Sequence, residues 1–503
     1  MSLKRNIIAN YASQLYVTGV GILILPLYIK YMGAEAYGLV GFFTMLQAWF
    51  GLLDMGLTPT IGRETARYCS GTMSGLAYRQ LLRALTLIFA LVALVGGGGL
   101  WLLSDAIAQK WLNTETLSTA TVVLAVQIMA ISVALRWIGG LYRGVITGSE
   151  RFVWLSGFNV LIATLRFIAV FVSMSLYGFT PVVFFIHQLV VALIEVMGLW
   201  LASLKATPKV SCLNEPIGWS FQPVKPVLKF ALSIAFTSSV WVLVTQTDKL
   251  VLSGILPLAE YGYFTLAVLA ASGIMVISGP VSIALMPRLA RLNAEGKREE
   301  MIQVYRNATQ IVTIIAGSAA IVIAFNAELL LFAWTGDRDL AERAAPILRL
   351  YAIGNGFLAV AAFPYYLQYA LGNLRYHLIG NAVMVVVLIP GIIAAATYYG
   401  GVGAGWVWLG VNGGFLLTWV GYVHGKLVPG LHSKWLLNNI TKIIGLPLFF
   451  CSMKAYFFPY SQFDRWSAFF MLILVSTIVV CLALISSFLL SLRDKSIIKT
   501  QPD

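Results

Sequence analysis

The stretch WSAFFMLILVSTIVVCLALISSFLL, residues 466–490, has no charged side chain in 25 positions. As a helix it would reach about 37 Å, enough to cross a hydrocarbon core of roughly 30 Å. Backbone groups at that depth must bond to one another, so a spanning segment is a helix or part of a closed barrel. Barrel strands alternate apolar and polar positions, whereas this segment, like 261–286 and 308–325, is apolar on every side. The sequence therefore predicts transmembrane helices.

The composition of the whole chain agrees with this interpretation. Hydrophobic residues make up 59% of the 503 positions, charged residues 11%, and the mean hydropathy is +0.85. A soluble domain carries about 25% charged residues. The net charge of +14 would suit nucleic acid, but Lys and Arg lie mostly in short loops, where the positive-inside rule explains them. We expect a polytopic membrane protein that binds no nucleic acid.

Hydropathy divides the chain into about fourteen spans. Lys4 and Arg5 precede a first span that contains polar residues and no cleavage site, so we expect an uncleaved helix there. The predicted spans are 8–29, 37–60, 81–104, 117–138, 154–177, 180–203, 229–256, 260–285, 304–332, 346–371, 376–398, 402–425, 437–458 and 466–490.

The loops between these spans differ in charge. Most of the 34 Lys and Arg residues, among them Arg136 at the end of the fourth span and Arg143 after it, are assigned to one side of the membrane. Arg166, Lys249 and Arg349 lie inside or just within spans. The positive-inside rule then predicts that both termini are cytoplasmic.

Landmarks at span boundaries recur after 224 residues. Tyr37-Gly38 matches Tyr261-Gly262 at the entry to the second span of each half, and GSERF (148–152) matches GNLRY (372–376). Membrane hairpins that share Tyr, Gly and Arg at interfaces are the alternative explanation. A repeat of six spans would relate two parallel bundles by an axis along the membrane normal, around a central cleft. The expected domains are an N-terminal six-helix bundle (1–206), a cytoplasmic linker (207–228), a C-terminal six-helix bundle (229–430), and two further transmembrane helices with a cytoplasmic tail (431–503).

Four motifs, together with the plan of six, six and two spans, resemble a known family. They are DMGLTPTIGRETAR (54–67), GSERF (148–152), AEYGYFTLA (259–267) and MPRLARL (286–292). The chain is similar to the multidrug/oligosaccharidyl-lipid/polysaccharide exporter superfamily, within it to the O-antigen and polysaccharide translocases (flippases).

The resemblance implies a function. Such a protein moves undecaprenyl-diphosphate-linked oligosaccharides from the cytoplasmic to the periplasmic leaflet of the bacterial inner membrane by alternating access. A polysaccharide polymerase is a candidate partner. The sugar composition and the energy source stay open; the inside-negative potential is one candidate, since it favours outward movement of a diphosphate.

Arg166 is the most informative charge. It lies 12 residues beyond Trp154, about 18 Å along the helix axis and near mid-membrane. A lipid-facing arginine would cost at least about 2.5 kcal/mol, so Arg166 should face a cleft or a partner. Its guanidinium suits a diphosphate, with Asn159 on the same face as a second substrate-binding candidate. An internal ion pair with Glu195 on the sixth span is the alternative.

A second pair, Asp248 and Lys249, lies in the seventh span. Lys249 is a candidate for substrate binding and Asp248 for coupling to a proton or sodium ion. The alternative is that the two side chains neutralise each other, with Lys249 extending toward the interface.

Two groups of charges near span ends are candidate gates, whose ion pairs would break when the cleft opens. A solvated helix end explains the inner group equally well, because exposed pairs contribute little. The inner group is Asp54, Arg63, Glu64 and Arg67, and the outer group is Glu328 and Arg349, with Asn326 beside Glu328.

Other classes of protein are less favoured. We find no Walker-type loop, no His, Cys or carboxylate cluster at metal-ligand spacing, and no loop long enough for a catalytic domain, so we expect neither an enzyme nor a bound cofactor or metal. A membrane-embedded polysaccharide polymerase should have a large periplasmic loop. A multidrug or cation antiporter of the superfamily should have an acidic cleft. A lipid II translocase would share the helix count and the cationic cleft, and it stays open.

Overall fold

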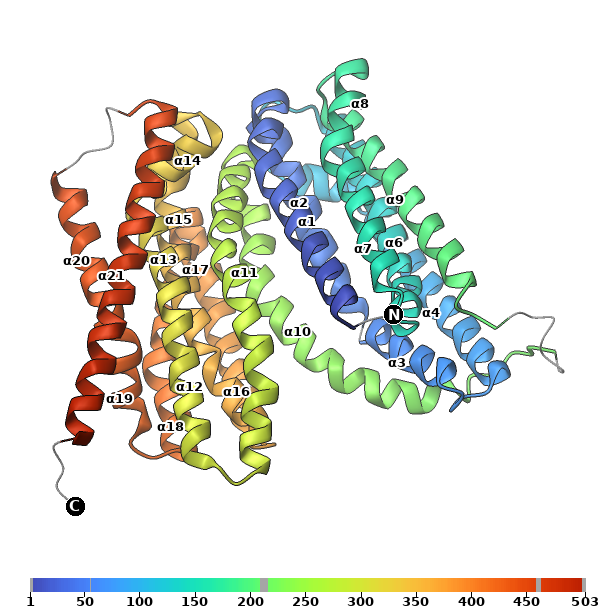
Figure 1. The fold of residues 1–503 in the computed structure, drawn as a ribbon. Coiled ribbons are helices and arrows are strands. Elements are labelled where there is room, and N and C mark those ends of the chain that lie inside the picture. The colour runs from blue at the N-terminus through green and yellow to red at the C-terminus, as the bar shows by residue number, and fades with distance from the viewer. Residues whose placement is uncertain (1–2, 55, 209–215, 458–462, 500–503) are drawn as a thin grey trace. The chain divides into compact units, whose positions relative to one another are not determined.

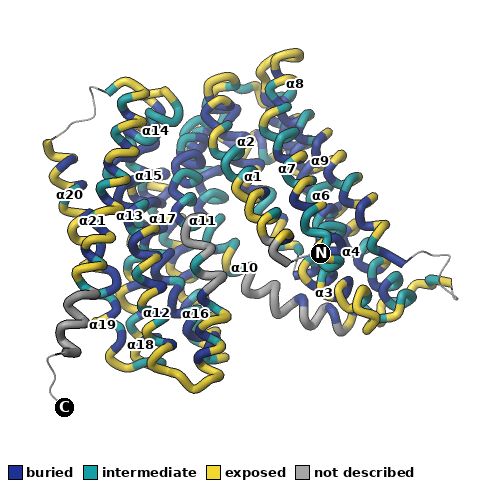
Figure 2. Tube along the Cα trace, in the orientation of Figure 1, coloured by how far each residue is buried: buried dark blue, intermediate teal, exposed yellow. Residues whose placement is uncertain are grey.

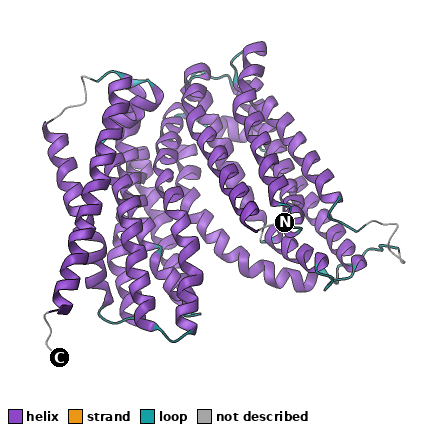
Figure 3. Cartoon of the chain, viewed as in Figure 1, coloured by secondary structure: helices purple, strands orange, loops and turns teal. Residues whose placement is uncertain are grey.

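The computed structural model describes residues 3–54, 56–208, 216–457 and 463–499. Figure 3 shows that these residues form helices joined by short loops, and no strand is assigned among them. The prediction of an all-α polytopic membrane protein is therefore confirmed.

Twelve helical segments in the described part of the chain are long and apolar enough to cross a membrane. They are Ile8–Met32, Ala34–Asp54, Gly75–Leu102, Thr119–Gly148, Phe152–Tyr177, Pro181–Leu204, Leu258–Val276, Arg298–Phe325, Arg338–Ala370, Arg375–Leu427, Leu431–Phe457 and Arg465–Leu490.

The predicted count of fourteen is not confirmed, and two segments account for the difference. Arg375–Leu427 is 53 residues long and includes a kink at Gly400, whose φ of 56° and ψ of −141° are not helical. The sequence places two spans there. Helix α10 (Val224–Ile255) corresponds to the predicted seventh span but is not among the twelve.

The chain divides into two compact units, Met1–Gly262 and Tyr263–Asp503 (Figure 1). The first unit contains α1 (Leu3–Met32), α2 (Ala34–Phe50), η1 (Gly51–Asp54), α3 (Leu57–Cys69), α4 (Gly75–Leu102), α5 (Ser104–Ala106), η2 (Ile107–Trp111), α6 (Thr119–Gly148), α7 (Phe152–Ala163), η3 (Thr164–Ala169), α8 (Val170–Tyr177), α9 (Pro181–Leu204) and α10. Helix α11 (Leu258–Ala294) begins in the first unit and continues in the second.

The second unit is also entirely helical where it is described. It contains α12 (Arg298–Val312), η5 (Thr313–Gly317), α13 (Ser318–Phe325), α14 (Ala327–Thr335), α15 (Arg338–Ala361), α16 (Phe363–Ala370), α17 (Arg375–Gly414), η6 (Phe415–Trp419), α18 (Val420–Leu427), α19 (Leu431–Leu436), η7 (Leu437–Thr441), α20 (Lys442–Phe457) and α21 (Arg465–Lys499). Its core gathers around Tyr305, Phe363 and Trp435, which are at most 1% exposed.

Large apolar side chains remain exposed on many helices. Exposed positions recur along α21 (Figure 2), where Phe470, Leu474 and Phe488 are more than half exposed. A soluble protein rarely exposes so large an apolar surface. These faces fit contact with lipid chains.

The second predicted span, 37–60, is too long. Helix α2 ends at Phe50, a 3₁₀ turn follows over η1, and α3 begins at Leu57. The break has two local causes. Gly56 has a φ of 71°, a left-handed conformation that favours glycine, and Asp54 caps the next helix by accepting from the Thr58 amide.

The fourth predicted span, 117–138, is too short. Ser118 caps α6, and the helix continues to Gly148. Arg136 and Arg143 therefore lie within a candidate span and not in a loop. It was wrong to place Arg143 in a loop and to count Arg136 with the charges of the loops, because a helix that packs against protein can carry charges inside its span where polar side chains bind them.

Equivalent helices of the predicted repeat begin at matching positions. Helices α2 and α11 begin at Ala34 and Leu258, which are 224 residues apart. A Cβ added at Gly38 would overlap the carbonyl oxygen of Leu258, and one added at Gly262 would lie 2.8 Å from that of Ala34. The two contacts are reciprocal at the same offset, as an internal repeat would produce.

Candidate functional site

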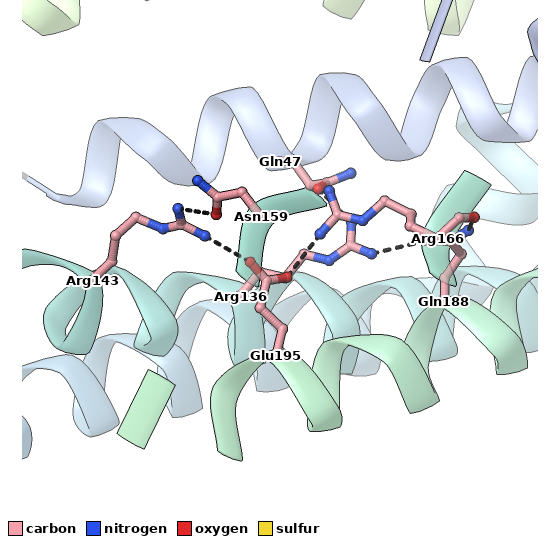
Figure 4. A network of polar contacts seen from close by, with 7 residues as sticks. All are labelled: Gln47, Arg136, Arg143, Asn159, Arg166, Gln188 and Glu195. Carbon is pink, nitrogen blue, oxygen red and sulfur yellow. Dashed lines mark hydrogen bonds and ion pairs between the residues drawn. The ribbon is translucent and has the colours of Figure 1, made fainter. Parts of the chain in front are cut away.

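A polar network lies inside the first unit, among helices that are otherwise apolar. Figure 4 shows its seven side chains, which come from α2, α6, α7, η3 and α9. They are Gln47, Arg136, Arg143, Asn159, Arg166, Gln188 and Glu195.

Glu195 on α9 is the centre of the network. Its Oε1 accepts from Nη2 of Arg143 at 2.9 Å, and its Oε2 accepts from Nη2 of Arg166 at 2.8 Å. Nη1 of Arg143 also donates to Oδ1 of Asn159 at 2.8 Å. One carboxylate thus binds two arginines from different helices, and its side chain is 11% exposed.

Arg136 is held by amides. Its Nη1 donates to Oε1 of Gln47 at 2.6 Å, and its Nη2 donates to Oε1 of Gln188 at 2.9 Å. Gln188 in turn donates from Nε2 to the backbone oxygen of Arg166 at 2.9 Å. Gln188 therefore connects Arg136 to the helix that carries Arg166.

The backbone around Arg166 is π-helical. The wider turn of η3 departs from the α-helical bonding pattern, and side chains of α9 bind two of its carbonyl oxygens. Gln188 binds that of Arg166, and Nε2 of His187 lies 2.9 Å from that of Leu165. The π-helical turn and these two contacts fix the direction in which Arg166 leaves the helix.

The network has more positive than negative groups. Three guanidinium groups face the one carboxylate of Glu195, and no carboxylate within the described residues lies at ion-pair distance from Arg136. The Nε atoms of Arg136 and Arg166 are buried and have no hydrogen-bond partner there. Buried donors normally have partners. The network therefore carries more positive charge than its one carboxylate balances.

A pocket of about 270 Å³ adjoins this network at Arg136. It lies among α2, η1, α3 and α6. Its polar lining includes Gln47, Asp54, Thr58 and Arg136, and its aromatic lining is Phe50 and Trp137.

The structure brings together three of the predicted site residues: Arg166, Asn159 and Glu195. The sequence left two alternatives for Arg166, substrate binding and an ion pair with Glu195. The ion pair is present. Asn159 contacts Arg143 and not Arg166. Whether the same group binds a substrate stays a prediction.

Lys249 and Asp248 lie apart from this network, on α10. Nζ of Lys249 is 3.6 Å from Oδ1 of Asp248 and donates to the backbone oxygen of Thr245 at 2.7 Å. Asp248 is 1% exposed. The geometry is that of mutual neutralisation, and the coupling role proposed for Asp248 stays a prediction.

The inner gate candidates divide into two places. Glu64 binds Arg67 at 2.9 Å and lies 3.8 Å from Arg63, all on α3. Asp54 instead accepts from the hydroxyl of Thr58 at 2.5 Å and caps that helix. The outer candidates are not joined: among the described residues Glu328 and Arg349 form no ion pair, and Arg349 is exposed. No group that could hold a metal ion occurs in the described chain.

Sequence reasoning missed Arg136 and Arg143. The signal was their spacing of seven residues, two helical turns, which places both on one face of α6. It also missed Lys454, which lies within the predicted span 437–458. Lys454 is 6% exposed on α20, and its Nζ donates to Oδ1 of Asn326 at 2.8 Å.

Solved structures with this fold are transporters and flippases. The lipid II flippase MurJ in an inward-closed conformation aligns with a TM-score of 0.70 at 14% identity, over 98% of this chain and 99% of that one. An inward-facing multidrug resistance MATE transporter of the MOP superfamily aligns with a TM-score of 0.65 at 14% identity, over 84% and 96%. A MOP superfamily transporter from Pyrococcus furiosus aligns with a TM-score of 0.54 at 14% identity, over 86% and 97%.

The twelve candidate spans and the fold shared with these structures define the chain as a multi-pass membrane protein. It belongs to the polysaccharide biosynthesis protein family, whose model matches residues 3–293, more than half of the chain. The resemblance derived from the four sequence motifs is thereby confirmed at the level of the superfamily. No curated protein sequence matches the chain.

Proposed function

We propose that the chain is a flippase for undecaprenyl-diphosphate-linked oligosaccharides, which it moves from the cytoplasmic to the periplasmic leaflet of the bacterial inner membrane by alternating access. Both termini are then cytoplasmic, and the protein is a carrier and not an enzyme. The single observation that carries the proposal is the excess of guanidinium over carboxylate groups around Glu195.

A diphosphate fits this excess for a physical reason. Within a membrane-spanning bundle, uncompensated positive groups are costly and need a partner. Guanidinium groups bind phosphate oxygens through two parallel hydrogen bonds. Glu195 holds Arg143 and Arg166 when the site is empty, and a diphosphate supplies the negative charge that the site lacks.

The membrane potential can supply the driving force. An inside-negative potential drives an anion outward, and this movement releases about 2.3 kcal/mol per charge per 100 mV. The two charges of a diphosphate can therefore supply the driving force for translocation without antiport of an ion. Asp248 lies apart from the arginine network, and the charge of its carboxylate is balanced by Lys249. This arrangement agrees with translocation that is not coupled to an ion.

Translocation of lipid II is the second candidate. The fold similarity to MurJ spans nearly both chains, and lipid II shares the polyprenyl diphosphate. A cation exporter is less favoured, because the network has three basic groups and one acidic group. A polysaccharide polymerase is less favoured because the solved structures with this fold are transporters.

Reconstitution tests the proposal. The purified chain in proteoliposomes, with a clamped inside-negative potential and no ion gradient, should translocate labelled undecaprenyl-diphosphate-oligosaccharide faster than phosphatidylcholine. Lipid II in a parallel reaction separates the two cargo classes, since faster flux of lipid II would assign the chain to that pathway. Flux of either diphosphate lipid no higher than in protein-free liposomes would contradict the proposal.

A further inference from the structure

The pocket beside Arg136 has the chemistry of a polyol site. Its polar lining offers donors and acceptors together, and its walls include the rings of Phe50 and Trp137. Trp137 stacks on Phe89 with ring centroids 4.2 Å apart and is 8% exposed. The ring stack makes it a rigid wall.

Arg136 brings donors to this pocket. Each of its two Nη atoms gives one hydrogen bond, to Gln47 or to Gln188, and carries a second hydrogen. A guanidinium N–H only donates. A ligand that binds Arg136 must therefore bring acceptors.

Asp54 is a hydrogen-bond acceptor in the pocket and therefore needs donors from the ligand. Its carboxylate accepts from the amide and hydroxyl of Thr58 and has lone pairs to spare. A hydroxyl group both donates and accepts, so a ligand with several hydroxyls can bind Asp54 and Arg136 together. The negative charge of Asp54 disfavours an acidic ligand.

The size of the pocket sets a limit. Its 270 Å³ falls just below the roughly 300–1,000 Å³ of pockets for drug-sized ligands. A volume of this size suits one sugar ring.

We infer that this pocket binds the first, uncharged sugar of the lipid-linked cargo, the one attached to the diphosphate. The inference rests on the proposed function. Its geometric basis is Arg136, which lines the pocket and is connected through Gln188 to the segment that carries Arg166.

Binding measurements on the full-length chain in lipid nanodiscs test the subsite. The two probes are undecaprenyl diphosphate and the same lipid bearing one uncharged hexose. The wild-type protein should bind the hexose form about tenfold more tightly, which corresponds to about two net hydrogen bonds. The lipid bearing one hexuronic acid should show no such preference, and an equal or larger preference for it overturns the inference.

Two variants locate the effect. Asp54→Asn removes the charge but keeps a side-chain oxygen that can accept from the Thr58 amide. Gly140→Ala adds a methyl group 3.1 Å from Oγ1 of Thr58, within the pocket lining. The ratio of the two dissociation constants should fall to about one in either variant.

Gly139→Ala is the matched control. It lies next to Gly140 on α6, but its added methyl would meet Leu199 of α9 at an ordinary 3.4 Å. This variant should keep the preference. A ratio near one in the wild type, retention of the preference in both pocket variants, or equal loss in Gly139→Ala overturns the subsite. Absence of binding to undecaprenyl diphosphate itself instead overturns the proposed function, and the subsite with it.

Discussion

Arg166 binds one oxygen of Glu195 at 2.8 Å, while Arg143 binds the other oxygen at 2.9 Å. One carboxylate thus holds together two cations from different helices. A phosphate group that enters the site competes with Glu195 for both guanidinium groups. The carboxylate therefore sets both the stability of the empty site and its affinity for an anion.

Neutralising Glu195 should separate these two effects. Glu195→Gln keeps a hydrogen-bond acceptor but removes the competing charge, so the affinity for undecaprenyl diphosphate should rise about fivefold, a change of about 1 kcal/mol. Glu195→Ala leaves two neighbouring cations without their shared partner and should destabilise the fold by about 3 kcal/mol.

Titration and thermal unfolding in the same detergent measure both effects. A Glu195→Gln variant that binds the diphosphate more weakly than the wild type would show that Glu195 does not compete with the ligand.

Replacing Arg166 should impair translocation. Arg166→Ala removes a guanidinium and its flux should drop at least about tenfold, whereas Arg166→Lys keeps the charge without the planar fork and should retain part of the flux. Arg151→Ala is the control, because Arg151 precedes α7 and contacts the backbone of Ala202 at the end of α9. Full flux in the Arg166→Ala variant would remove Arg166 from the substrate site.

The contact between Gly38 and Leu258 should tolerate no side chain. A Cβ at Gly38 overlaps backbone, which cannot move aside as a flexible side chain can, so Gly38→Ala should destabilise the protein by about 2 kcal/mol. Gly98→Ala is the control, since an added methyl there meets nothing within 4 Å. Thermal unfolding of both variants measures the difference, and equal midpoints would mean that the two segments are not packed so closely.

Lys454 should contribute to stability through Asn326. Lys454→Ala leaves the buried Oδ1 of Asn326 without this donor and should cost about 2 kcal/mol. Lys442 on the same helix makes a similar contact, 2.6 Å to Oδ1 of Asn438, but is exposed. Lys442→Ala should therefore change stability by less than about 0.5 kcal/mol. Equal losses in the two variants would count against a stabilising role for the buried contact.

Hydropathy predicted the all-helical membrane fold because long apolar runs have one stable solution in a bilayer. It located span ends less well. Asp54 and Gly56 end the second span through a cap and a left-handed turn, and neither signal changes the average hydropathy of a window. Helix α6 extends past its apolar window because Gln47, Asn159 and Glu195 bind its arginines.

The candidate site was predictable only in part. Arg166 and Glu195 are isolated charges in neighbouring apolar spans, so their pairing was foreseeable as one alternative. Arg136 and Arg143 lie close to the end of their apolar window, where loop and helix look alike in sequence. The π-helical turn at η3 has no sequence signal, and it depends on contacts from α9 that only the folded chain supplies.

The measurement that tests the central claim most directly is equilibrium binding of undecaprenyl diphosphate to the purified full-length chain and to the double variant Arg143→Gln, Arg166→Gln. Binding at the arginine network predicts that the double variant loses at least about a hundredfold in affinity, since each charge-assisted hydrogen bond is worth roughly 1.5–3 kcal/mol. Equal dissociation constants for the two proteins, with both folded, would place the diphosphate elsewhere and contradict the account.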